Sequence, residues 1–207
     1  MTTTTDLLRL TQWLSPAFPI SGFAYSHGLE AAMAQGRVTD AASTKAWVST
    51  VLTMGAGALD AWVIRTVMAG QDPAEMADLL QARAGSAERW EETRAQGAAF
   101  VATTNAMGAT PLGEMPLPVA VALRARDMDP TAVIALYLHG FASSIVSAAT
   151  RFLPLGQAEA QTILQALHPI ITDLSQSTSK TPPGSAALLA ELDAMAHETQ
   201  TARLFRT

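Results

Sequence analysis

The chain has 207 residues, of which 49% are apolar and 15% charged, and its formal net charge is −5. This length suits one domain with a substantial core, and the acidic balance offers no basic field for a nucleic-acid backbone. The absence of cysteine excludes disulfides, zinc–thiolate sites and thiol nucleophiles. The first nine residues lack the basic start and apolar stretch of a signal peptide, which predicts a cytoplasmic protein.

The first half of the chain is predicted to form helices separated by proline and glycine. Thr5 or Asp6 is expected to cap a helix that reaches residue 14, before two prolines force an extended loop. A second helix is predicted from about residue 25 to residue 35, with Gly36 as its stop. The later helices of this half are predicted at 40–54, after Thr39 or Asp40, at 59–68, from Pro73 after the cap Asp72, and from Ser86 to about Met107.

The second half continues the pattern. Residues 111–118 are predicted to form a long surface loop, and residues 175–184 a flexible linker. Helices are expected at 117–126, from Pro130 after the cap Asp129 to about 153, at 157–175 with a kink or restart at Pro169, and at 186–202. No alternating β-branched run is long enough for a strand. The sequence therefore predicts one all-α domain over residues 1–207, a helical bundle of roughly eight to ten helices.

Residues 130–150 carry no formal charge and resemble a membrane span in length. Small and polar side chains, including His139 and three serines, dilute their apolar character. A central helix packed on several sides by other helices explains the same pattern. A membrane-associated protein built around this segment stays as an alternative.

Sequence signatures of catalysis and of metal binding are missing. No phosphate-binding loop, no G-x-S-x-G elbow and no H-E-x-x-H pair is present. The four histidines are far apart in sequence, although a fold could bring them together. We therefore predict no catalytic residue, no metal ligand and no cofactor.

Residues 15–30 do not look like ordinary bundle sequence, because prolines, glycines, aromatics and a histidine–glutamate pair lie close together. On a helix, His27 and Glu30 would share a face and could hydrogen-bond. Gly28 inside that helix would cost roughly 1 kcal/mol relative to alanine, which makes sense if another backbone approaches closely there. The alternative is a loop that merely closes one end of the bundle.

The end of the chain is also unusual, because Leu204 and Phe205 lie between Arg203 and Arg206. A tail with nothing to bind is expected to be polar. Arginine and aromatic residues are enriched at binding hot spots. Residues 203–207 are therefore predicted to bind a partner, unless Leu204 and Phe205 fold back onto the core of their own domain.

Three stretches carry a family resemblance. Residues 18–30, FPISGFAYSHGLE, resemble the amino-terminal motif of UreF urease accessory proteins. Residues 148–157, AATRFLPLGQ, are similar to an internal block of that family, and residues 197–206 to its closing motif. The chain departs from the usual pattern at Ser21, at Ala24 and at Thr201-Ala202, which weakens the expectation of identical polar contacts in the tail.

The resemblance implies an all-α homodimer that binds the accessory protein UreD (UreH in some organisms), recruits the GTPase UreG and acts on apo-urease during nickel insertion. The tail of that family binds UreD/UreH, and the amino-terminal motif is linked to partner or dimer contacts. The predicted partner-binding residues are Phe23, Tyr25, Ser26, His27, Glu30, Arg151, His197, Arg203, Leu204, Phe205 and Arg206.

Two other classes of function remain open on sequence alone. A small all-α enzyme could use His27 and Glu30 as an acid–base pair, which would require a closed pocket and a shifted histidine pKa. A nickel-binding metallochaperone would need histidines that converge in the fold. The scaffold hypothesis is preferred because it alone explains both ends of the chain.

Overall fold

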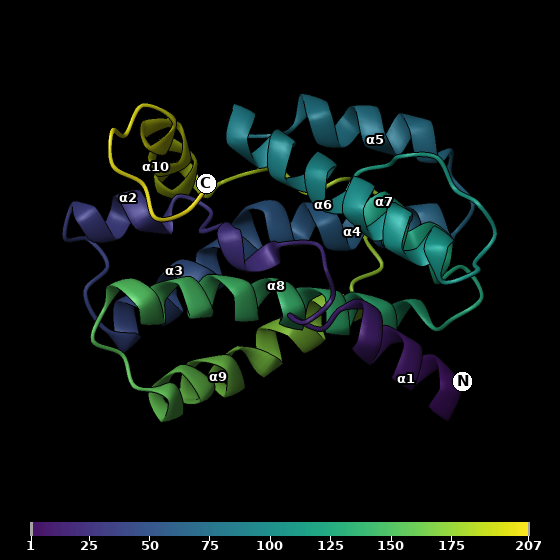
Figure 1. Cartoon of the computed structure of the whole chain (residues 1–207), viewed down its shortest axis with the longest axis horizontal. Coiled ribbons are helices and arrows are strands. Elements are labelled where there is room, and N and C mark those ends of the chain that lie inside the picture. The colour runs from purple at the N-terminus through teal and green to yellow at the C-terminus, as the bar shows by residue number, and fades with distance from the viewer. Residues whose placement is uncertain (1, 207) are drawn as a thin grey trace.

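The structure is a computed structural model that describes residues 2–206, without the side chain of Phe23 (Figure 1). Its elements in chain order are α1 (Thr4–Trp13), the 3₁₀ helix η1 (Gly22–Ala24), α2 (Leu29–Ala34), α3 (Ala41–Met54), α4 (Ala56–Met68), α5 (Pro73–Ala82), α6 (Ala87–Ala106), α7 (Leu117–Arg124), α8 (Pro130–Phe152), α9 (Gln157–Gln176) and α10 (Leu188–Glu198). Residues 2–206 contain no strand. The predicted all-α, single-domain bundle is confirmed.

Polar caps explain where several helices begin. Four caps fall where the sequence placed them, and the side chain of each accepts a hydrogen bond from a backbone amide two or three residues further on. These caps are Asp40, Asp72, Ser86 and Asp129. Proline follows directly after Asp72 and Asp129, where its missing N–H costs the helix nothing. The starts of α3, α5, α6 and α8 were therefore readable from local sequence.

The first helix begins earlier than predicted. Thr3, and not Thr5 or Asp6, is its cap: the Asp6 amide donates to Thr3 Oγ1 at 3.1 Å, and the Thr3 amide donates to Asp6 Oδ2 at 3.0 Å. This reciprocal pair is a capping box. Asp6 therefore lies inside the first turn, where its carboxylate supports the start of the helix.

The carboxy-terminal third differs from the prediction in the bounds of α10. α9 passes through Pro169 as one helix without a restart, and α10 covers a shorter range than the predicted 186–202. The segment between these two helices, for which flexibility stays a prediction, contacts α4 and the end of α5, and we call it the strap. Trp62 Nε1 donates to the Ser179 carbonyl at 3.2 Å, and Arg83 Nη1 donates to the Pro183 carbonyl at 2.8 Å.

The long helix α8 lies at the centre of the packing. It contacts α1, α2, α3, α4 and α9, and α9 lies along its flank in Figure 1. Its fully buried side chains include Ile134, Leu138 and Ile145, which join Phe100 of α6 in one core. At one end of the molecule α10 packs against α2 and α6, so the last helix lies beside the amino-terminal motif (Figure 1).

Two stretches, Ala41–Met68 and Pro130–Phe152, are long and apolar enough to cross a membrane by length and composition alone. Core packing explains both, because 56% of one apolar window and 50% of the other are buried inside the fold. The first stretch is also divided into α3 and α4 at Gly55. These helices do not indicate a membrane protein, and α8 is the packed central helix that the sequence favoured.

Gly97 permits the close approach of the loop before α7 to α6. A Cβ added at Gly97 would lie 1.9 Å from the Met115 carbonyl oxygen, a backbone atom. We expect Gly97→Ala to lower the free energy of unfolding by about 1–3 kcal/mol, since overpacking a tight contact has this cost. Urea denaturation followed by circular dichroism measures it. Gly156→Ala is the matched control, because no atom lies within 4 Å of its added Cβ; equal stability of the two variants would contradict the expectation.

Candidate partner-binding site at the junction of the two ends of the chain

The amino-terminal motif folds as a series of tight turns and not as the predicted helix from residue 25. His27 and Gly28 have φ angles of 54° and 74°, in the left-handed region, so α2 begins only at Leu29. The predicted close backbone approach at Gly28 is confirmed, because an added Cβ would lie 2.7 Å from the Ala194 amide nitrogen of α10. Gly28 therefore serves as a turn residue that lets the last helix dock, and its predicted position inside a helix was wrong.

The predicted pairing of His27 with Glu30 on one helix face is wrong, because His27 lies outside α2. His27 Nε2 lies 3.2 Å from Glu92 Oε1 of α6. Glu30 Oε2 lies 3.1 Å from His197 Nε2 of α10. Each member of the pair thus contacts a residue far away in sequence, which joins the motif to α6 and to α10.

Glu30 holds the carboxy-terminal tail in place. Its side chain is 1% exposed, and it accepts hydrogen bonds from the backbone amides of Leu204, at 2.8 Å, and Phe205, at 2.9 Å. The fully buried His197 contacts Glu30 through one ring nitrogen and Glu88 Oε2 through the other, at 2.8 Å. Arg203 completes the chain by donating to Glu88 Oε1 at 2.6 Å. One carboxylate therefore links α2, α10 and the tail.

The two apolar residues of the tail point in different directions. Phe205 is 6% exposed and belongs to the core, while Leu204 is 70% exposed. The Arg151 guanidinium lies over the Phe205 ring at 5.5 Å, a cation–π geometry. The Arg206 amide donates to the Ala24 carbonyl at 2.7 Å. The fold-back alternative therefore holds for Phe205 and not for Leu204.

The remaining residues of the motif are internal. Ser26 is buried, and its Oγ accepts a hydrogen bond from the Glu30 amide at 3.3 Å. Burial raises the pKa of the Tyr25 phenol, although a hydrogen bond with Arg206 partly opposes the rise. The Phe23 side chain lies outside the described part of the structure. Most of the predicted site residues thus meet in one place, where they join the two ends of the chain to each other.

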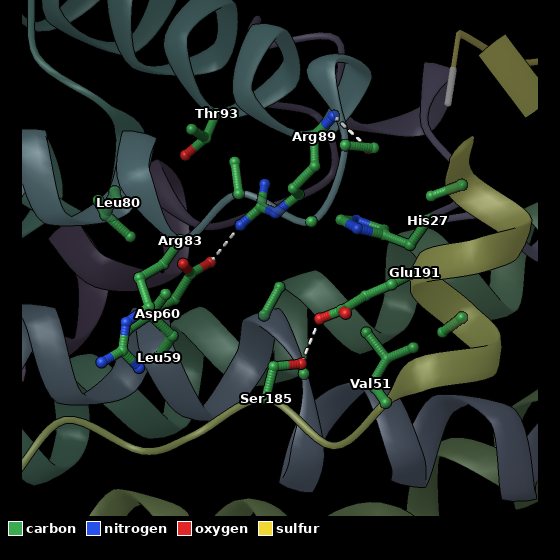
Figure 2. Close-up of a pocket in the computed structure, with 18 of the residues that line it drawn as sticks. His27, Val51, Leu59, Asp60, Leu80, Arg83, Arg89, Thr93, Ser185 and Glu191 are labelled. Atoms are coloured by element: carbon green, nitrogen blue, oxygen red, sulfur yellow. Dashed lines mark hydrogen bonds and ion pairs between the residues drawn. The ribbon is translucent and has the colours of Figure 1, made fainter.

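A second polar cluster adjoins this junction through the contact of His27 with Glu92. Arg89 of α6 donates to Asp60 Oδ2 at 2.7 Å and lies 3.5 Å from Glu92 Oε2, and the Tyr137 hydroxyl donates to Asp60 Oδ2 at 2.7 Å. Figure 2 shows the Arg89 guanidinium directed at Asp60, with His27 beside it. All three residues line a cavity of about 90 Å³ that the strap also lines, through Ser185 among others. Charged groups are therefore buried together where α4, α6 and α8 meet.

The pKa directions in this cluster follow from burial and from the charges nearby. Burial raises the pKa of Asp60, and the neighbouring Arg89 only partly offsets the rise. Burial also raises the pKa of Glu92, but His27 and Arg89 lower it more, so the net direction is down. Burial and the Asp60 carboxylate raise the pKa of Tyr137 well above its ordinary value. The pKa values of the two carboxyl groups are therefore shifted in opposite directions around one arginine.

Five residues of these clusters were not among the predicted site residues: Glu88, Asp60, Arg89, Glu92 and Tyr137. One local signal existed, since Arg89 and Glu92 are three residues apart on one helix face. Asp60 and Tyr137 had no signal, because only the packing of α4 against α8 brings them together.

The four histidines do not converge on one point. His27 and His197 each contact carboxylates, whereas His139 and His168 lie side by side on α8 and α9. Burial and the neighbouring His168 lower the pKa of His139, so its ring is neutral at neutral pH. Among the residues that the structure describes, no group of three or more His, Cys, Asp or Glu is placed to hold a metal ion.

Comparison with known proteins places these motifs in a family. A sequence model of the UreF family matches residues 38–168. The chain belongs to the UreF family of urease accessory proteins. Over 206 residues it is 52% identical to the urease accessory protein UreF of Cereibacter sphaeroides strain KD131, covering 97% of this chain and 98% of that protein. It is 50% identical over 205 residues to UreF of Dinoroseobacter shibae, with coverage of 97% and 98%, and 48% identical over 210 residues to UreF of Jannaschia sp. strain CCS1, with coverage of 99% and 96%.

Membership of the UreF family gives the junction a context. A urease accessory protein works together with other proteins of urease maturation, and the family suggests a non-catalytic role. The buried contacts of Glu30, His197 and Phe205 suit such a role, because they fix the position of α10 and the tail. The surface that these two segments present to solvent is therefore the candidate partner-binding site.

Proposed function

We propose that this chain is a cytoplasmic homodimeric scaffold without catalysis of its own. It holds UreD/UreH, recruits UreG and presents both to apo-urease for GTP-dependent nickel insertion. Its membership of a family named for urease accessory proteins supports the proposal. GTP hydrolysis is assigned to UreG, because the present sequence has no phosphate-binding loop.

The observation that carries the proposal is an apolar surface on α10, which we call the α10 stripe. Its members are Leu188, Leu189, Leu192 and Met195, and each side chain is about half exposed or more. Leu188, Leu192 and Met195 follow the i, i+4, i+7 spacing of one helix face. The opposite face of α10 packs against α2 and α6. An exposed apolar face of this kind marks a protein-interaction surface.

The tail extends the chemistry of the α10 stripe. Leu204 is a further exposed apolar side chain, while Phe205 anchors the tail in the core. The exposed residues Arg203 and Arg206 flank them and can make forked hydrogen bonds to carboxylates of a partner. We therefore assign docking on UreD/UreH to Leu204, the two arginines and the α10 stripe.

The buried members of the predicted site receive a different role in this proposal. Tyr25, Ser26, Glu30 and His197 position α10 and the tail from inside. Rigid support of this kind reduces the conformational entropy that α10 and the tail lose when a partner docks. These residues affect binding indirectly, through the order of the surface above them.

A charge placed in the α10 stripe tests the proposal. We expect Leu192→Asp to weaken binding of UreD/UreH about 30-fold or more, the loss typical of an interface hot spot. Leu192 is 50% exposed in the free chain, so the fold should persist. Affinity is measured by biolayer interferometry with purified UreD/UreH, and circular dichroism reports the fold.

Leu8→Asp is the matched control, because Leu8 is an exposed leucine of α1, 67% exposed, at a distance from α10 in Figure 1. It should bind UreD/UreH as the unmodified chain does. Unchanged binding by Leu192→Asp, or an equal loss in both variants, would contradict the assignment of the surface.

A further inference from the structure

Two histidines meet on the face that α8 and α9 share. The ring centroids of His139 and His168 lie 5.8 Å apart, with the ring planes tilted by 45°. His139 is half-buried in the middle of the central helix, and His168 is exposed on its neighbour. Within residues 2–206, no hydrogen bond occupies a nitrogen of either ring. Both imidazoles therefore have nitrogen atoms open to a ligand.

We infer that His139 and His168 together bind one divalent first-row transition-metal ion, with water molecules at the remaining coordination positions. Neutral imidazole is a preferred ligand of Zn²⁺, Ni²⁺ and Cu²⁺. A metal–nitrogen bond of about 2.0–2.1 Å requires the two rings to close on the ion. The exposed His168 can make that movement by side-chain rotation, while α8 holds His139 in place.

The surroundings of the pair suit a partly hydrated ion. His139 lines a cavity of about 400 Å³ whose polar members include Ser143, Gln157 and Gln161. Such a cavity has room for ordered water on the inner side of the ion. The two helices that supply the ligands pack against each other in the fold, so the backbone positions of both histidines are set before metal arrives.

This site is separate from the proposed docking surface. The two histidines lie on α8 and α9, whereas docking is assigned to α10 and residues 203–206. Only two protein ligands contribute, which predicts an exchangeable ion and not a closed structural site of four ligands. The inference goes beyond the proposed scaffold function and can fail independently of it.

Calorimetric titration of the full-length, untagged chain with NiSO₄, and separately with ZnSO₄, tests the inference without any partner protein. We expect one ion per chain. His139→Ala and His168→Ala should each weaken metal binding more than tenfold. Loss of a residue that merely hydrogen-bonds a metal ligand already lowers metal affinity about tenfold, and loss of the ligand itself should lower it further. Gln165→Ala, one turn from His168 on the exposed side of α9, is the control and should bind as the unmodified chain does.

A second readout locates the ion. In ¹⁵N-histidine spectra, Zn²⁺ should shift the imidazole signals of His139 and His168 and leave those of His27 and His197 in place. Binding that survives in the His139→Ala/His168→Ala double variant would overturn the inference. So would a titration without saturable binding by the unmodified chain, or shifts confined to the other two histidines.

Discussion

Replacing Glu30 with alanine is expected to lower the free energy of unfolding by about 3–5 kcal/mol, the cost of removing one partner from a buried ionic contact. The change removes the acceptor of two tail amides and the contact with the fully buried His197. Unpaired buried donors account for much of this cost. Urea denaturation followed by tryptophan fluorescence measures it.

The same variant should release the tail before it unfolds the domain. The amides of Leu204 and Phe205 donate to Glu30, so their hydrogen exchange should become fast in Glu30→Ala while α8 stays protected. Glu91→Ala is the control, because Glu91 is 60% exposed and pairs with Arg94 at the surface. Glu91→Ala should lower the free energy of unfolding by less than about 1 kcal/mol. A tail that remains protected in Glu30→Ala would contradict the assigned role.

Replacing Arg89 with methionine should also lower the free energy of unfolding at neutral pH by about 3–5 kcal/mol. Arg89 is the cation shared by the buried carboxylates of Asp60 and Glu92, at 2.7 Å and 3.5 Å. Methionine keeps an unbranched apolar side chain and removes the charged guanidinium, so both carboxylates lose their shared cation. Denaturant titration at about pH 7 measures the loss.

The loss caused by Arg89→Met should depend on pH, with a sign that follows from Asp60. Burial raises the pKa of Asp60 in the folded state, and removing Arg89 raises it further. A carboxyl whose folded pKa exceeds its unfolded value, about 3.9, binds its proton more tightly when folded, so its cost grows as pH rises through the raised pKa. The variant should therefore recover stability relative to the unmodified chain as pH falls.

Glu92 gives the unmodified chain a contribution of the opposite sign. Its folded pKa is lowered, so the stability it contributes is present above its unfolded pKa and is lost as pH falls through the folded value. Together, the Asp60 and Glu92 effects reduce the difference in free energy of unfolding between Arg89→Met and the unmodified chain as pH falls. Arg94→Met, which breaks only a surface pair, should show no such convergence. An Arg89→Met loss that is equal at about pH 5 and pH 8 would contradict this account.

Local chemistry made much of the fold predictable. Asp72 and Asp129, each followed by proline, marked helix starts correctly, and the break predicted after residue 54 divides α3 from α4. These features depend on neighbours within one turn of the chain, so sequence contains them. The start of α1 was misplaced by two residues because Thr3 and Asp6 form a capping box that competes with the caps considered.

The contacts of the site were not predictable in the same way. The sequence singled out His27, Glu30 and His197 but paired the first two, because three-residue spacing favours contact on a helix. The left-handed backbone at His27 and Gly28 prevents that helix, and the true partners lie in α6 and α10. Tertiary packing determines which residues pair, and a local sequence pattern does not reveal partners on distant helices.

The tail illustrates the same limit. Leu204 and Phe205 have the same flanking arginines and similar apolar character, so sequence could not separate their roles. The amides donated to Glu30 fix the tail so that Phe205 enters the core and Leu204 faces solvent. The alternatives of docking and folding back therefore apply to different residues of one motif.

Site-specific photo-crosslinking tests the central claim most directly, namely that α10 and the tail form the docking surface. A benzophenone amino acid is placed at Leu192, at Leu204 or at Leu8, and each chain is irradiated with UreD/UreH, UreG and apo-urease. We predict crosslinks to UreD/UreH from positions 192 and 204 and none from position 8. Crosslinks to UreD/UreH from position 8, with none from positions 192 and 204, would contradict the account.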